Sequence, residues 1–138
     1  MALDLNTILI YGSADGILRN DSTPKPYLSF VDGILAGQGS GPLNPDPVMC
    51  GVVAFGSRPA DVDAACAWLM GFDPDVLPVV AQAYRPCRFP LGDGDWRDVQ
   101  VISNRPEWRG SLTSIADRDC FHFEPHFGWK GAVERRVR

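Results

Sequence analysis

The hydrophobic pattern of the first half of the chain predicts four regular elements. Residues 5–11, LNTILIY, form a short β-branched apolar run closed by turn residues, which favours a strand. In residues 26–37, apolar side chains recur at helical spacing, so a helix is expected there. The nearly continuous apolar run 48–55 is typical of a strand buried on both faces. Residues 59–71 return to a helical period, with a proline in the first turn.

The second half is less regular. A short helix is expected over residues 74–84, after which proline, glycine and charged residues become frequent. Residues 99–102, VQVI, favour a strand, and the aromatic segment 121–129 cannot form one helix because Pro125 would break it. The predicted fold is therefore α/β: a small single layer of mostly parallel strands flanked by helices, with a loop-rich C-terminal third, in one domain over residues 1–138.

Composition narrows the class of protein. A chain of 138 residues that is 45% hydrophobic can form one core. Its net charge of -4 argues against nucleic acid as a partner, because binding phosphates requires clustered lysine and arginine. The chain has no apolar run of about 20 residues and no signal-like start, so we expect a cytoplasmic protein without a membrane partner.

The cysteines do not form a recognisable metal motif. Cys50, Cys66, Cys87 and Cys120 are far apart, and no pair has the close spacing with which two thiolates bind one ion. Cys50 and Cys66 lie among apolar residues and are expected to be buried as small hydrophobes. A disulfide scaffold is not expected in a cytoplasmic protein.

A glycine-rich loop is the first candidate site. Glycines let backbone amides approach an anion closely, which makes the loop a candidate for cofactor binding. The loop follows a predicted helix and leads into a strand, the reverse of a dinucleotide-binding fingerprint, so a simple connecting turn is the favoured alternative. The candidate cofactor-binding residues are Gly37, Gln38, Gly39, Ser40 and Gly41.

Two acidic residues, Asp61 and Asp63, are the second candidate. Both fall near the start of the helix that follows the predicted buried strand. Ligands of open α/β sheets lie beyond the carboxyl ends of the strands, which favours a site there. A carboxylate near a helix N-terminus is also stabilised by the helix dipole, so a structural role is equally open. Two such close positions cannot both face one ligand.

The third candidate is a metal site formed by His122, Glu124 and His126. In an extended segment these three side chains would project to one side and could bind a divalent cation. The alternative, favoured for histidines beside aromatic residues, is that each imidazole packs and makes one hydrogen bond. A pH-sensitive role for the imidazoles also stays open.

Several segments together resemble the domain-of-unknown-function family 362. They read LDLNTILIY at residues 3–11, VDGILAGQGSGP at 31–42, GVVAFGSRPADVD at 51–63, LMGFDP at 69–74 and PHFGWKG at 125–131. The resemblance implies a glutamate where this chain has Gln38, and alanine or valine at the position of Asp61. Asp63 is therefore the preferred candidate for a catalytic residue.

The resemblance also concerns partners and cofactors. Family members continue upstream of the position that is Met1 here, so the chain resembles the C-terminal half of the family, and a partner subunit could supply the upstream half. Some members accompany ferredoxin-type cysteine runs that are missing here, so this chain alone is not expected to bind an iron-sulfur cluster.

Two classes of function are left open. One is an enzyme or enzyme subunit, redox or metal-linked, whose site is formed by the glycine-rich loop and the start of the following helix. The other is a non-catalytic binding or assembly module that forms a homo-oligomer or pairs with a partner subunit. The abundance of tryptophan and phenylalanine, with 4 and 7 residues, suits an interface as well as a core.

Overall fold

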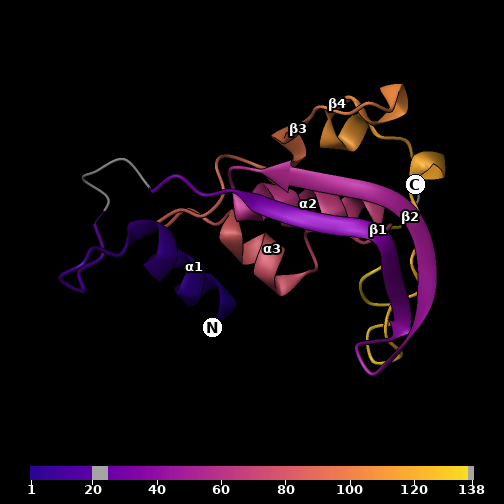
Figure 1. The fold of residues 1–138 in the computed structure, drawn as a ribbon, viewed down its shortest axis with the longest axis horizontal. Coiled ribbons are helices and arrows are strands. Elements are labelled where there is room, and N and C mark those ends of the chain that lie inside the picture. The colour runs from indigo at the N-terminus through magenta and orange to yellow at the C-terminus, as the bar shows by residue number, and fades with distance from the viewer. Residues whose placement is uncertain (20–24, 137–138) are drawn as a thin grey trace.

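The computed structural model describes residues 1–19 and 25–136 (Figure 1). Three α-helices are present in these ranges: α1 (Ala2–Tyr11), α2 (Pro59–Leu69) and α3 (Pro78–Ala83). The strands are β1 (Ser29–Ser40), β2 (Asn44–Gly56), β3 (Gln100–Val101) and β4 (Gly110–Ser111). Single-turn 3-10 helices occupy Trp96–Asp98, Pro106–Trp108, Leu112–Ser114 and Asp117–Asp119.

The dominant element is a long antiparallel hairpin formed by β1 and β2. Ser29 pairs with Gly56 at its base and Ser40 with Asn44 at its tip. The register shifts between Gly33 and Leu35, a β-bulge that bends a strand pair, and the hairpin curves along its length (Figure 1). The second sheet, β3 with β4, is also antiparallel. The prediction of mostly parallel strands is therefore wrong, although the mixture of helix and strand is confirmed.

Two predicted elements have the opposite secondary structure. The first apolar run lies in helix α1 rather than in a strand, because a run of seven residues is too short for its periodicity to distinguish a strand from a helix. Residues 26–37 contain most of β1 rather than a helix. Glycines at three positions of β1 disfavour a helix, and β2 supplies its hydrogen-bonding partner.

β2 contains the predicted strand 48–55 but is not buried on both faces. Exposed and part-buried residues alternate along it, as they do along an antiparallel strand with one solvated face. On the inner side, Val52 packs against the core. The alternation was hidden in the sequence because the outward residues of β2 are also apolar.

Helix α2 confirms the helix predicted from residue 59 and lies along the inner side of the hairpin (Figure 1). Its Val62 approaches the backbone of Gly56 so closely that a Cβ on Gly56 would lie 2.7 Å from Val62 Cγ2. Helix α3, shorter than the predicted 74–84, packs beside α2. The base of the hairpin is therefore packed against α2.

The core lies between α2 and the C-terminal loops. Its buried residues are Ala64, Val80, Trp96, Trp108, Leu112 and Ile115. Indole N–H groups tie the loops down: Trp108 donates to the carbonyl of Asp119 at 3.0 Å, and Trp68 of α2 donates to the carbonyl of Ile115 at 3.3 Å. Tryptophan thus gives the loop-rich third the packing that regular structure provides elsewhere. No helix in the described ranges has the length and apolar character needed to cross a bilayer.

Candidate functional site

The structure brings the glycine-rich loop and the aromatic C-terminal segment together. Gly39 donates its backbone N–H to the carbonyl of Glu124 at 2.8 Å, and the Glu124 N–H donates to Gln38 Oε1 at 2.9 Å. These two reciprocal bonds fix Glu124 against the tip of β1. The first and third candidate sites, separated by more than eighty residues in sequence, are therefore neighbours in the fold.

Between them lies an open recess of about 140 Å³. Apolar side chains from the end of α2 and the C-terminal segment, Met70, Phe72 and Phe123, contribute to its lining. Its polar lining includes Gln38, Glu124 and His126 together with glycines 37, 39 and 41. Because the Gly39 N–H already donates to the carbonyl of Glu124, this backbone donor of the loop is not available to an anion.

The loop itself is the end of a hairpin. Ser40 closes β1, and the turn to β2 passes through Gly41 and Pro42, joined by a cis peptide bond. Gly37 is required sterically, since a Cβ there would lie 2.8 Å from Pro45 Cβ. The loop is therefore the turn that connects β1 to β2.

The proposed metal ligands do not converge. His122 adopts a left-handed backbone with φ 54°, which interrupts the alternation that would have placed it beside Glu124 and His126. Its Nε2 lies 2.8 Å from the carbonyl of Asp117 instead. Glu124 pairs with Lys130 at 2.9 Å. Across residues 1–19 and 25–136, no group of three or more histidine, cysteine or acidic side chains could hold a metal ion.

His126 is also occupied locally. Its Nδ1 accepts a hydrogen bond from the Gly128 N–H at 3.3 Å, and its ring packs on Phe127 with centroids 4.0 Å apart. This is the packed arrangement, with one hydrogen bond, that sequence analysis set against metal binding.

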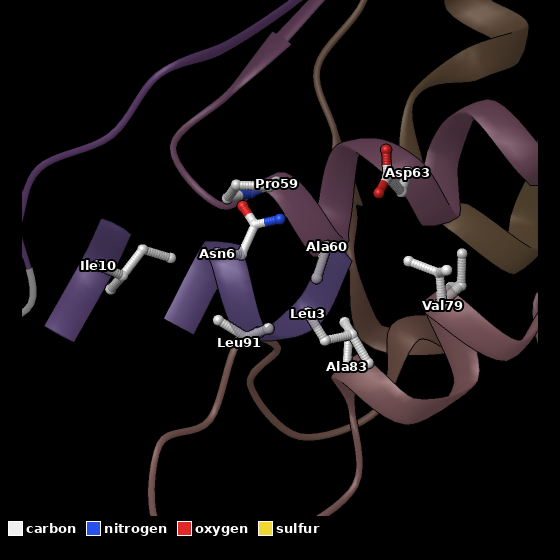
Figure 2. A pocket seen from close by; sticks show the side chains of 10 residues that line it. Leu3, Asn6, Ile10, Pro59, Ala60, Asp63, Val79, Ala83 and Leu91 are labelled. Carbon is white, nitrogen blue, oxygen red and sulfur yellow. The ribbon is translucent and has the colours of Figure 1, made fainter. Parts of the chain in front are cut away.

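Asp63 lies in a different hollow, between α1, α2 and α3 (Figure 2). The hollow has a volume of about 20 Å³, room for roughly one water molecule. The Asp63 side chain is exposed, yet the surrounding protein atoms raise its pKa by partial desolvation. Besides Asp63, the lining of the hollow is apolar apart from the amide of Asn6. The other lining residues are Leu3, Ile10, Pro59, Ala60, Val79, Val80, Ala83 and Leu91.

The two acids of α2 have different surroundings. Asp61, set aside in favour of Asp63, accepts a hydrogen bond from the Tyr84 hydroxyl at 2.7 Å and pairs with Arg58 Nε at 3.0 Å. Arg58 also pairs with Asp93 at 2.9 Å. Burial, followed by the bond to Asp61, raises the pKa of Tyr84. This network joins the end of α3 to the start of α2, and only the Arg58–Asp61 spacing could have been recognised in the sequence.

A second polar cluster, also missed from sequence, lies at the other end of α2. The guanidinium of Arg135 bonds to Asp117 at 2.6 Å and lies 3.7 Å from the centroid of the Trp68 ring. Arg135 also donates to the sulfur of Cys120 at 3.4 Å. Its side chain is only 11% exposed. The cluster attaches the last described residues to α2. None of the four cysteines, Cys50, Cys66, Cys87 and Cys120, forms a disulfide.

The outer side of the hairpin carries exposed apolar side chains from both of its strands. Register places Phe30 of β1 directly opposite Phe55 of β2, and Leu35 opposite Met49. These four side chains are between 60% and 76% exposed. Large uncovered apolar patches are rare on monomeric proteins and mark surfaces for protein or membrane contact.

Comparison with known families matches residues 1–68 to the family described as "Domain of unknown function (DUF362)". The matched segment contains α1, the whole hairpin and nearly all of α2. The chain resembles this family, and the match ends before the loop-rich C-terminal third. Comparison with curated proteins and with solved structures gave no match.

Proposed function

We propose that this chain is a binding or assembly module that presents the outer side of its β1–β2 hairpin to a protein partner. The observation that supports the proposal most is the uncovered apolar face around Phe30 and Phe55, which are 65% and 72% exposed. An isolated two-stranded hairpin is at best marginally stable in water. Covering its second face would supply the hydrophobic burial that α2 supplies on the first.

The enzyme proposal has less geometric support. It requires the glycine-rich loop and Asp63 in one site, whereas they line separate hollows. The two hollows involve opposite ends of α2: Asp63 lies near its start, whereas Met70, in the recess beside the loop, directly follows its end. The hollow beside Asp63 is too small for an organic substrate, at about 20 Å³.

The partner takes one of two forms in this proposal: another copy of the chain, or a different subunit. Either partner would be recognised by apolar contact rather than by charge. Within β1 and β2, the only charged side chains are those of Asp32 and Asp46.

Native mass spectrometry of the chain purified from its own cells tests this proposal. We expect a mass above the 15.1 kDa of one chain, and a return to that mass when Phe55 is replaced by serine. A single-chain mass at every protein concentration would contradict the proposal. So would an assembly that F55S and F30S leave intact, because the partner would then lie elsewhere.

A further inference from the structure

The recess between the tip of the hairpin and the C-terminal segment has room for a small molecule. Its volume is about 140 Å³, and an apolar cavity of roughly 150 Å³ is large enough to bind benzene. Phe123, which is 7% exposed, and the part-buried Met70 and Phe72 contribute apolar surface. Aromatic and thioether side chains pack favourably against a flat ring. The apolar part of the lining therefore favours one aromatic ring as the occupant.

Two polar side chains of the lining, Gln38 and His126, have their hydrogen-bonding roles fixed by their neighbours. Gln38 Oε1 accepts the Glu124 N–H at 2.9 Å, so the other group of the amide is an NH2 with two donors. His126 Nδ1 accepts the Gly128 N–H at 3.3 Å, so the neutral imidazole carries its proton on Nε2. Both residues can therefore donate a hydrogen bond to a molecule in the recess.

The side-chain acceptor of the recess is the carboxylate of Glu124. Its Oε1 pairs with Lys130 at 2.9 Å, which offsets the negative charge. A carboxylate has lone pairs for about four hydrogen bonds, so Glu124 can keep Lys130 and still accept from a ligand. The polar lining thus combines N–H donors with one carboxylate acceptor.

We infer that the recess binds a small aromatic carboxamide, a single ring that carries one neutral amide group. The ring packs on Phe72 and Phe123, the amide carbonyl accepts from Gln38 or His126, and the amide N–H donates to Glu124. A hydrocarbon would leave these polar groups without partners. An anion is disfavoured, because the Glu124 carboxylate repels it. The inference does not depend on the proposed function, since it makes no use of the outer side of the hairpin.

The two sides of the recess are held together without a ligand. Gly39 donates to the carbonyl of Glu124 at 2.8 Å, and Glu124 donates back to Gln38. The Phe123 N–H donates to the carbonyl of Met70 at 2.8 Å, which ties the same segment to the end of α2. A site that is already assembled loses less conformational freedom when a ligand binds.

Proton–nitrogen correlation NMR of the unmodified chain, titrated with benzamide, tests the inference. We expect saturable shifts of the backbone amides of Gly37, Glu124 and His126, with a dissociation constant in the millimolar range for so small a ligand. Benzoate has the same ring but is an anion without an N–H, and it should bind at least about fivefold more weakly. Benzamide shifts that do not saturate, or equal affinities for the two compounds, would overturn the inference.

A matched pair of variants tests the role of Gln38. Q38E keeps the oxygen that accepts the Glu124 N–H but replaces the NH2 donors, so benzamide should bind at least about fivefold more weakly. Q82E makes the same change on an exposed residue of α3, away from the recess, and should leave the affinity unchanged.

Spectra recorded without ligand show whether each variant is folded. A folded Q38E that binds benzamide as tightly as Q82E does would contradict the inferred contact with Gln38. Should Q38E fail to fold, the comparison of benzamide with benzoate on the unmodified chain still decides whether the recess takes a carboxamide.

Discussion

The hairpin and the C-terminal third bury their apolar residues in opposite ways. The C-terminal third has little regular structure, yet Leu112 and Ile115 are 0% and 1% exposed. The hairpin has the longest strands in the described structure, yet Met49 and Phe55 are 76% and 72% exposed. Regular structure and burial are therefore separate properties in this chain.

The largest expected effect contrasts an aliphatic residue from each region. Leu112→Ala should lower the free energy of unfolding by about 3 kcal/mol, because it leaves a cavity in the core. Val53→Ala on the outer side of the hairpin, at 51% exposure, should lower it by no more than about 0.5 kcal/mol. Urea unfolding of the diluted chain measures both values. Equal losses of unfolding free energy in the two variants would contradict the difference in burial between the core and the outer side of the hairpin.

The next effect concerns the side-chain contacts that hold the C-terminal third. Arg135→Ala should lower the free energy of unfolding by about 2 kcal/mol, since it leaves Asp117 without its guanidinium partner and removes the contact with Trp68. Arg118→Ala is the control: its side chain is 86% exposed, and the loss should stay below about 0.5 kcal/mol. Similar urea midpoints for the two variants would show that the Arg135 cluster is not stabilising.

A smaller effect is expected where the two regions meet. Gly56→Ala places a methyl group 2.7 Å from Val62 Cγ2, so the hairpin and α2 must move apart. The expected loss is about 1 to 2 kcal/mol, in the lower part of the usual range for overpacking. In the control Gly128→Ala, the new carbon lies 3.5 Å from His126 Nδ1, an ordinary contact. A neutral Gly56→Ala variant would mean that α2 does not fix the base of the hairpin.

The smallest effect is the pH dependence of Asp63. Partial desolvation raises its pKa in the folded state above 3.8, so the folded state retains the proton to higher pH than the unfolded state. Stability therefore falls as the pH rises from about 3.8 through the folded pKa, and the full loss persists above it.

Asp63→Asn should consequently be slightly more stable than the unmodified chain at neutral pH, by less than about 1 kcal/mol because the side chain is exposed. The difference should vanish below pH 3.8. Unfolding midpoints measured at both pH values give the comparison. An Asp63→Asn variant that is less stable at pH 7 would show that the carboxylate has a favourable partner.

Sequence patterns predicted the elements whose signals are local. α2 was recognisable because a proline in the first turn and a helical apolar period agree. β1 was misassigned because Leu28, Val31, Ile34 and Leu35 fit a helical spacing, while the partner strand that decides the matter lies across a turn. Tertiary pairing overrode the local period, as it often does for strands.

The candidate sites show the same division. The approach of Gly39 to Glu124 depends on how the hairpin curves around α2, and no local pattern encodes it. The expected metal site depends on regular alternation through His122, and the left-handed backbone of that residue interrupts the alternation. The family resemblance disfavours Asp61 as a catalytic residue. In the structure Asp61 accepts a hydrogen bond from Tyr84, a contact between residues 23 positions apart that no local pattern predicts.

The most direct test of an interface on the outer side of the hairpin is amide hydrogen exchange at low and high protein concentration. If a second copy covers that side, exchange along β1 and β2 should slow as the concentration rises, while exchange in α2 should change little. Exchange rates in the hairpin that are independent of concentration, or new protection confined to α1, would contradict it.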